Sequence, residues 1–215
     1  MLEKNNFFSF LFKLYIILFI LLFISLAFIE KGTVVLALNG AHTDILDTFF
    51  KYTTNLGDGL AFGILVIVLI FVKYRYAIMV AGAGLLHGLI IALFKNVFFA
   101  GSPRPKTFFA GQDVLHFVEG VSVHGHRSFP SGHTASAFAW TLMLILIIKR
   151  KSWLTLLLAV ALIVGASRIY LAQHFYVDTV VGALIGSVSS AFVYRMIQKW
   201  QGKAWFDKSV PWFSK

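Results

Sequence analysis

The chain has 215 residues, of which 59% are hydrophobic, 16% aromatic and only 13% charged. Soluble domains are about half apolar and about a quarter charged, so this composition excludes an ordinary soluble domain and indicates a membrane protein with several spans. The formal net charge of +10 does not indicate nucleic-acid binding, because the charges lie between apolar runs and no nucleic-acid-reading module is visible. Cysteine is absent, which excludes a disulfide framework and thiolate chemistry.

Six apolar runs follow one another along the chain, and a membrane-spanning helix needs about 20 such residues. They cover 7–29, 60–72, 77–94, 131–148, 153–171 and 175–196, and the second extends back toward Thr54. The first is longer than the apolar region of a cleaved signal peptide, about 7–15 residues, so we interpret it as a retained span. We therefore expect an all-α polytopic membrane protein with six transmembrane helices and both termini on one side.

The segment between the first two runs, 30–58, is mixed in polarity. Ile45, Phe49 and Tyr52 have helical spacing in it, so we expect a loop with one short amphipathic helix. The residues after the last run, 198–215, are basic and aromatic, which is typical of a segment that lies at the membrane interface.

The basic residues indicate the orientation of the six spans. Twelve of the nineteen Lys and Arg residues fall on the side of the termini and seven on the opposite side. Cytoplasmic loops carry the excess of positive charge, so both termini and the tail 198–215 are predicted to be cytoplasmic. The polar segments 95–131 and 168–178 then face the outside together.

Three polar clusters lie in these outward segments. The first begins at Lys95 and ends at Arg104, which stands between two prolines. The second is the turn 131–133, Ser-Gly-His, at the start of the fourth run. A helix start presents free N–H groups and a positive dipole end, which suit a phosphate. The third cluster runs from 167 to 178 and holds Arg168, His174 and Asp178.

The residue types in these clusters suit phosphate chemistry. His174 and Asp178 are four residues apart and would share one helix face. A carboxylate on one imidazole nitrogen fixes the tautomer and leaves the other nitrogen as a nucleophile or base. Guanidinium groups bind phosphate oxygens in pairs, and a lysine adds a point charge. The clusters predict a phosphate-transfer site that needs no metal.

Each of these residues also has a plain structural interpretation. His174 could be an interfacial polar residue, Asp178 a partner of a helix dipole, and Arg168 a cation snorkelling from a span end. Arg104 could be an ordinary loop charge. Ionisable groups at membrane depth are costly and usually functional, so their concentration on one side favours a site.

The remaining histidines receive other interpretations. His124 and His126 could form a metal site with His133, but the spacing fits no strong ligand pattern. His42 and His87 are interpreted as structural. Three further polar residues are expected to belong to the loop or to contact a substrate headgroup: Gln112, His116 and Glu119.

These residues resemble the type 2 phosphatidic acid phosphatase family, membrane lipid phosphatases related to vanadium haloperoxidases, and in particular its bacterial phosphatidylglycerophosphatase and lipid A phosphatase members. The family motifs are Lys-x6-Arg-Pro, Pro-Ser-Gly-His and Ser-Arg-x5-His-x3-Asp. Residues 130–133 and 167–178 match the second and third position by position. The first motif departs from the family pattern, because eight residues and not six separate Lys95 from Arg104. Lys106 is an alternative, but we favour Lys95 because it closes the third run.

The resemblance implies a role for each matched residue. His174 would attack phosphorus and form a phosphohistidine, and Asp178 would orient it. His133 would protonate the leaving oxygen and then help to activate water. The groups that would hold the phosphoryl oxygens are Lys95, Arg104, Ser131, Gly132 and Arg168. No metal or other cofactor is implied.

The sequence thus predicts one membrane phosphatase domain, 1–215, with its motifs within 95–178, in a bacterial cytoplasmic (inner) membrane. It would act on a phosphorylated membrane lipid at the outer face: phosphatidylglycerol phosphate, phosphatidic acid, undecaprenyl pyrophosphate or a lipid A phosphate. A lipid phosphotransferase that passes the group to a second lipid or sugar is the alternative. A transporter or scaffold with a vestigial site is a third hypothesis. The choice of lipid and the oligomeric state stay open.

Overall fold

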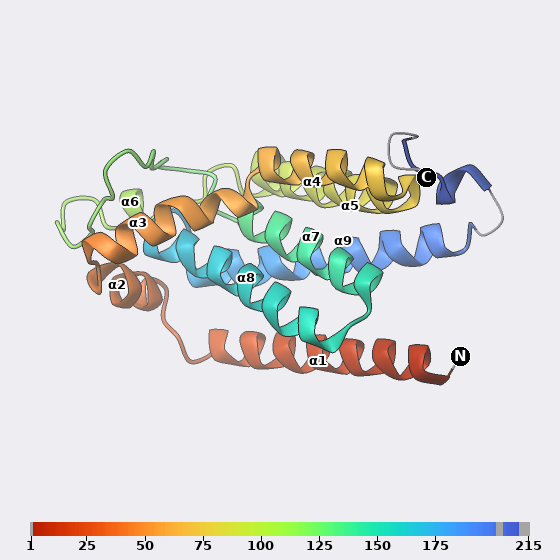
Figure 1. Ribbon diagram of the computed structural model, residues 1–215. Coiled ribbons are helices and arrows are strands. Elements are labelled where there is room, and N and C mark those ends of the chain that lie inside the picture. The colour runs from red at the N-terminus through yellow and green to blue at the C-terminus, as the bar shows by residue number, and fades with distance from the viewer. Residues whose placement is uncertain (1, 201–203, 211–215) are drawn as a thin grey trace.

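The computed structural model of the chain describes residues 2–200 and 204–210, and the regular secondary structure in them is entirely helical (Figure 1). This confirms the predicted all-α class. The helices are α1 (Leu2–Leu26), α2 (Thr33–Gly40), α3 (Asp44–Thr53), η1 (Thr54–Gly57), α4 (Gly59–Val72), α5 (Tyr74–Leu93), η2 (Phe94–Phe98), α6 (Pro105–Phe108), α7 (Gly132–Ile148), α8 (Lys151–Tyr170), α9 (Tyr176–Gln198) and η3 (Ala204–Asp207).

Four helical segments of the described chain are long and apolar enough to cross a membrane by themselves: Phe7–Leu26, Tyr74–Phe98, Lys151–Tyr170 and Tyr176–Gln198. A fifth span results if Asp44–Gly57 and Gly59–Val72 are taken together, with a bend of 54° between them. The two arms meet at Asp58, and we call residues 54–58, which comprise η1 and Asp58, the break segment. The chain is therefore a multi-pass membrane protein with four or five candidate spans. The sixth predicted span corresponds to α7, which has 17 residues.

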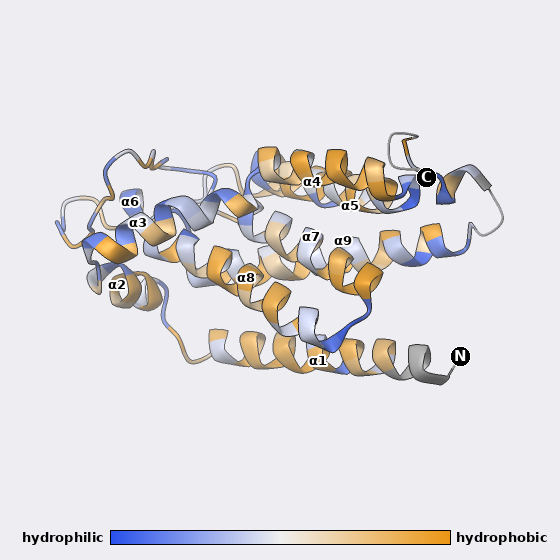
Figure 2. Ribbon diagram, viewed as in Figure 1, coloured by the Kyte–Doolittle hydropathy of each residue, from blue (hydrophilic) through white to orange (hydrophobic). Residues whose placement is uncertain are grey.

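The surface of the bundle agrees with a lipid environment. Large apolar side chains point outward along α1, where Phe12, Ile17 and Leu21 are each more than half exposed. Figure 2 shows apolar residues along the long helices and polar residues in the connections at the ends. The hydrophobic effect would not leave such side chains outward in water, so they indicate contact with acyl chains.

α7 lies at the centre of the bundle against α5, α8 and α9. The packing against α9 is closest where Gly182 and Gly186 face the α7 backbone. A Cβ at Gly182 would overlap the carbonyl oxygen of Ser131, and one at Gly186 would overlap that of Ala135. Small residues of this spacing let two membrane helices approach backbone to backbone. This contact brings the start of α7 beside the start of α9.

The segment 30–58 contains more helix than the sequence analysis predicts. The amphipathic helix expected around Ile45 is α3, but α2 was predicted to be loop. The Asn39 side chain near the end of α2 is fully buried, where its amide donates to the carbonyl oxygens of His116 and Tyr170, both at 2.8 Å. The asparagine that suggests a turn in the sequence is therefore a buried bridge between distant segments.

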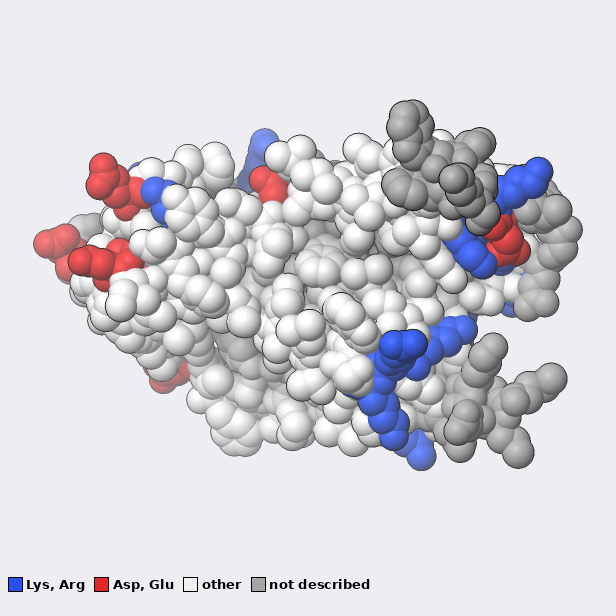
Figure 3. Space-filling view, in the orientation of Figure 1, with Lys and Arg blue, Asp and Glu red and all other residues white. Residues whose placement is uncertain are grey.

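The two ends of the bundle differ in charge. The start of α1 and the end of α9 lie at the same end (Figure 1), together with the α7–α8 turn that carries Lys149, Arg150 and Lys151. In Figure 3 blue side chains gather toward this end, and most of the red ones gather at the opposite end, near α2 and α3. Part of the predicted tail, 201–203 and 211–215 with Trp212, lies outside the described residues.

Candidate active site

The three sequence clusters meet at the end of the bundle that carries α2, α3 and the long loop, which is the segment 99–131 between η2 and α7. His174 lies in the turn between α8 and α9, and its N–H donates to the carbonyl oxygen of Arg168 at 3.1 Å. The N–H of Ser131, just before α7, donates to the carbonyl oxygen of Asp178 at 2.9 Å. An Arg104 guanidinium N–H donates to the carbonyl oxygen of Gln173 at 3.1 Å. Segments far apart in the sequence thus surround His174.

His174 and Asp178 form a buried pair, but they do not share a helix face as their spacing predicts, because His174 lies in the turn before α9. The His174 Nδ1 and an Asp178 carboxylate oxygen are 3.3 Å apart, and the residues are 1% and 2% exposed. The same oxygen accepts from the Phe175 N–H at 3.0 Å and from the Ser128 hydroxyl. Because the carboxylate is held by three donors, it fixes the ring with Nε2 as the nitrogen that carries the lone pair.

The electrostatic environment keeps the His174 ring neutral. Burial lowers its pKa well below the ordinary value, and the positive charges of Arg168, Arg104 and Lys95 lower it further. Both effects disfavour the imidazolium, since a charged ring would be desolvated and repelled by its neighbours. A neutral imidazole beside several cations is suited to attack an anionic electrophile that those cations bind.

Arg104 is held by backbone and side-chain acceptors on two segments. Its Nε donates to the carbonyl oxygen of His126 at 3.0 Å, and one terminal nitrogen donates to the Gln173 side-chain oxygen at 2.9 Å. Gln173 is itself fixed by a 2.6 Å bond to the carbonyl oxygen of Ser122. Burial lowers the pKa of Arg104, but a guanidinium stays charged at physiological pH. The second terminal nitrogen has no partner among the described residues.

Arg168 lies in the last turn of α8 and is 6% exposed. One terminal nitrogen donates to the Thr54 hydroxyl at 2.6 Å, whereas its Nε is buried and has no hydrogen-bond partner among the described residues. An unsatisfied N–H on a buried cation is costly unless a ligand completes it. Arg168 is therefore available to an anion.

Ser131 starts α7 as its N-cap. Its hydroxyl oxygen contacts the Thr134 hydroxyl at 2.8 Å and accepts from the Thr134 N–H at 3.4 Å. The Ser131 N–H donates to the Asp178 carbonyl oxygen, so both the hydroxyl and the N–H of Ser131, a residue expected to hold phosphate, are engaged within the protein. The N–H groups of Gly132 and His133 make no bond to another described residue. These two, at the positive end of the helix, are the ones that could receive an anion.

Lys95 lies in η2, a π-helical turn that extends α5. It is half-buried and close enough to His174 for its charge to act on the ring, whereas Lys106 in α6 is exposed. A π-helical turn accommodates additional residues within a helix. The position of Lys95 near the cluster, and the exposure of Lys106, are consistent with Lys95 as the lysine of the first motif.

The other polar residues singled out in the sequence have exposed side chains or partners outside this cluster, although the backbone oxygen of His126 accepts from Arg104. His124 and His126 are exposed, and no group of three or more potential ligands in the described chain could hold a metal ion. His116 binds Asp47 at 2.7 Å and stacks on His42. The backbone oxygen of Glu119 accepts from Lys51, and Gln112 is exposed. His87 is buried, and its Nδ1 lies 2.8 Å from the carbonyl oxygen of Ala83.

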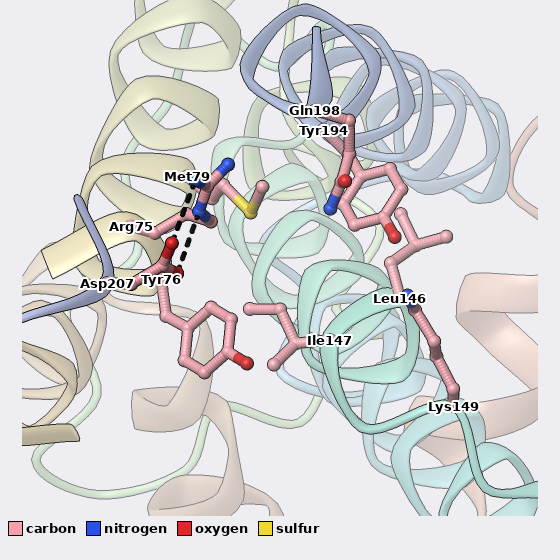
Figure 4. A pocket seen from close by; sticks show the side chains of 9 residues that line it. All are labelled: Arg75, Tyr76, Met79, Leu146, Ile147, Lys149, Tyr194, Gln198 and Asp207. Carbon is pink, nitrogen blue, oxygen red and sulfur yellow. Dashed lines mark hydrogen bonds and ion pairs between the residues drawn. The ribbon is translucent and has the colours of Figure 1, made fainter. Parts of the chain in front are cut away.

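A hollow of about 380 Å³ lies at the opposite end of the bundle from the candidate site (Figure 4). Its lining comes from the start of α5 and the ends of α7 and α9. The Arg75 guanidinium in it is already paired with Asp207 by two contacts of 3.3 Å. Lys149 stands at the negative end of α7 and over the ring of Tyr194. The Arg75 charge in this hollow is therefore already paired with a carboxylate of the protein.

A buried histidine–carboxylate pair lies among arginines at one end of a membrane helix bundle, an arrangement suited to phosphate chemistry. Residues 72–201, more than half of the chain, match the PAP2 superfamily. The chain therefore belongs to the PAP2 superfamily, and it is a hydrolase, a membrane phosphatase.

Two curated relatives are similar over most of the chain. One is the lipid A 4'-phosphatase of Porphyromonas gingivalis, 30% identical over 186 residues that cover 82% of this chain and 76% of that protein. The other is the undecaprenyl-diphosphatase BcrC of Bacillus subtilis, 29% identical over 157 residues that cover 71% and 75%.

Two crystal structures have a similar fold. LpxE of Aquifex aeolicus has a TM-score of 0.68 and 27% identity, and the match covers 77% of this chain and 94% of that one. The PAP2-type phosphatidylglycerolphosphate phosphatase of Bacillus subtilis has a TM-score of 0.62 over 94% of this chain and 100% of that one. Its identity of 21% supports the fold alone.

The structure also contains site residues that the sequence analysis missed. Ser128, Gln173 and Thr54 hold Asp178, Arg104 and Arg168, respectively, and each is buried. Ser128 and Gln173 are neighbours of motif residues, which is the only signal that the sequence offered. Thr54 lies outside all three motifs.

Proposed function

We propose that this chain is an integral membrane lipid phosphatase that works through a phosphohistidine on His174. The observation that carries the proposal is the buried, neutral His174 ring, held by Asp178 and surrounded by Arg104, Arg168 and Lys95. Phosphoryl transfer needs a positioned nucleophile and positive charge spread around the transferred group, and these residues supply both without a metal.

The reaction has two steps. In the first, the His174 Nε2 lone pair attacks phosphorus, the bond from phosphorus to the lipid oxygen breaks, and His133 gives that oxygen a proton. In the second, a water attacks the phosphohistidine, His133 takes its proton, and inorganic phosphate leaves with His174 restored. The groups that hold the phosphoryl oxygens in both steps are Lys95, Arg104, Arg168 and the free N–H groups at the start of α7, with Ser131 fixing that helix start.

A membrane lipid is the proposed substrate. The relatives are named for lipid A and for undecaprenyl diphosphate, and the site lies at the end of apolar helices, where a lipid headgroup would meet it. The candidates are phosphatidylglycerol phosphate, phosphatidic acid, undecaprenyl pyrophosphate and the phosphates of lipid A.

The proposal includes an orientation. With α7 and the bent pair counted as spans, the chain has six, both termini are cytoplasmic, and residues 1–215 form one membrane domain. The basic α7–α8 turn then faces the cytoplasm, in agreement with the excess of positive charge in cytoplasmic loops. The site would face the exterior or periplasm of a bacterial cytoplasmic membrane.

The test is release of inorganic phosphate from each of the four lipids by purified protein in detergent with a chelator present. The wild type should release phosphate from at least one lipid, and His174→Ala should lower kcat by about a thousandfold or more, since it removes the nucleophile. His124→Ala, which removes an exposed histidine of the loop between α6 and α7, should retain activity. Full activity in His174→Ala would refute the mechanism, and a phosphorylated acceptor in place of free phosphate would indicate a phosphotransferase.

A further inference from the structure

The break segment inserts between α7 and α8 beside the candidate active site. Trp140 on α7 donates from its indole N–H to the carbonyl oxygen of Leu56 at 2.9 Å. Gly57 packs so closely that a Cβ there would lie 2.6 Å from the carbonyl oxygen of His133 and 2.9 Å from its Cβ. The bend of the helix pair therefore places this segment directly against the backbone of the proposed proton donor.

The same segment holds the phosphate-binding arginine of α8. The Thr54 hydroxyl accepts from a terminal nitrogen of Arg168 at 2.6 Å, and both residues are 6% exposed. The two lie 114 residues apart in the sequence. A hydrogen bond to a buried charged donor is stronger than one between neutral groups, so it restrains the guanidinium plane.

The rest of that guanidinium is left open. The Arg168 Nε is buried and unpartnered among the described residues. A guanidinium binds phosphate through two parallel N–H groups on one edge, commonly Nε and a terminal nitrogen. One terminal nitrogen of Arg168 is bound to the Thr54 hydroxyl. The planar guanidinium can therefore present the edge formed by Nε and the second terminal nitrogen in only a narrow range of orientations.

We propose that Thr54 is a positioning residue for phosphoryl transfer, whose hydroxyl holds the Arg168 guanidinium with its Nε edge toward the transferred phosphate. The inference rests on the proposed function. It adds a residue from the helix break to a site otherwise built from the loop and the starts and ends of α7, α8 and α9. The bent pair is then part of the enzyme's phosphate-binding machinery as well as a membrane segment.

Thr54→Val tests this assignment, because valine has the shape of threonine without the acceptor. We expect kcat/KM for phosphate release to fall about tenfold or more, and inhibition by orthovanadate, a phosphate analogue, to weaken by a similar factor. Thr54→Ser keeps the hydroxyl and should retain most activity. Thr53→Val is the matched control, since the Thr53 hydroxyl donates to the Phe49 carbonyl oxygen of its own helix and has no other partner among the described residues.

A double-mutant cycle separates positioning from a general structural effect. If Thr54 acts through Arg168, Thr54→Val should cost little more in an Arg168→Ala background. Where Arg168→Ala lacks measurable turnover, the shift in unfolding temperature caused by orthovanadate measures the same coupling. An equal loss in both backgrounds, or wild-type activity of Thr54→Val, would overturn the assignment. In the latter case, loss of activity in His174→Ala would leave the proposed function standing.

Discussion

At the level of single residues, the site is a balance between burial and charge around one imidazole. Asp178 favours the imidazolium form of His174, but desolvation and three neighbouring cations oppose it and prevail, so the pKa of His174 is lowered. The Asp178 carboxylate is shared among the Ser128 hydroxyl, the Phe175 N–H and the His174 ring. Asp178 therefore orients the ring and leaves it neutral.

The protonation of His174 can be measured directly. A lowered pKa means that the ring takes up a proton only at lower pH, so His174 should remain neutral as the pH falls through 6.5, its ordinary pKa. Nitrogen NMR of histidine-labelled protein, with the signal assigned by its loss in His174→Asn, should show a midpoint well below that value. A midpoint at or above 6.5 would contradict the neutral-nucleophile interpretation.

At the level of helices, the site depends on how closely α7 and α9 approach. Ser131 and Asp178 belong to different motifs, and their backbones bond only because Gly182 and Gly186 admit the α7 backbone. The contact extends down the helices, where the Ser190 hydroxyl donates to the carbonyl oxygen of Ala139 at 2.6 Å. The close approach of α7 and α9 therefore brings the second and third motifs together in space.

Gly186→Ala tests the α7–α9 contact. The added methyl would overlap the carbonyl oxygen of Ala135, and a backbone atom cannot move aside as a side chain can. Overpacking costs about 1–3 kcal/mol, and alanine recovers up to about 1 kcal/mol of helix propensity, so we expect a net loss of stability. Thermal unfolding in detergent measures it. Gly88→Ala, with no atom within 4 Å of the new Cβ, should be neutral or slightly stabilising; equal behaviour of the two variants would contradict this account.

At the level of the whole molecule, the arrangement is polarised. The candidate site lies at one end with the long loop and α2, and the basic turn between α7 and α8 lies at the other (Figure 1). The basic turn at one end, the candidate site at the other and the outward apolar side chains between them suit a protein that receives its substrate from one leaflet of a membrane. The proposed orientation places that leaflet outside.

The absence of native cysteine makes the orientation directly testable. Gln112→Cys in the long loop and Ser152→Cys after the basic turn both introduce a thiol at an exposed position. In spheroplasts, a membrane-impermeant maleimide should label the first and should reach the second only after permeabilisation. The reverse pattern would overturn the proposed outer-face site. Only variants that retain phosphatase activity are labelled, so that the measured orientation is that of the folded enzyme.

Local patterns predicted a large part of this protein. The all-α class follows from long apolar runs, which depend on neighbours along the chain. The spacing of four residues paired His174 with Asp178, but the shared helix face was wrong, because His174 precedes α9 and the turn before the helix brings the two together. α2 was not predicted, since the polar Asn39 resembles a turn residue unless its buried partners are known. The six-span count stays a prediction, because α7 is short and the second span is bent.

The sequence by itself therefore determined the membrane class, the reactive residue types and the local pairs among them. Only the tertiary structure decided which groups hold them: Ser128 on Asp178, Gln173 on Arg104 and Thr54 on Arg168 are contacts across 50, 69 and 114 residues. Separations of this size carry no periodic signal, since the contacts arise from helix packing and from the bend in the α3–α4 pair. The physical reason is that hydropathy and helix geometry act over a few turns, whereas the orientation of a guanidinium or carboxylate is set by whatever the folded chain places beside it.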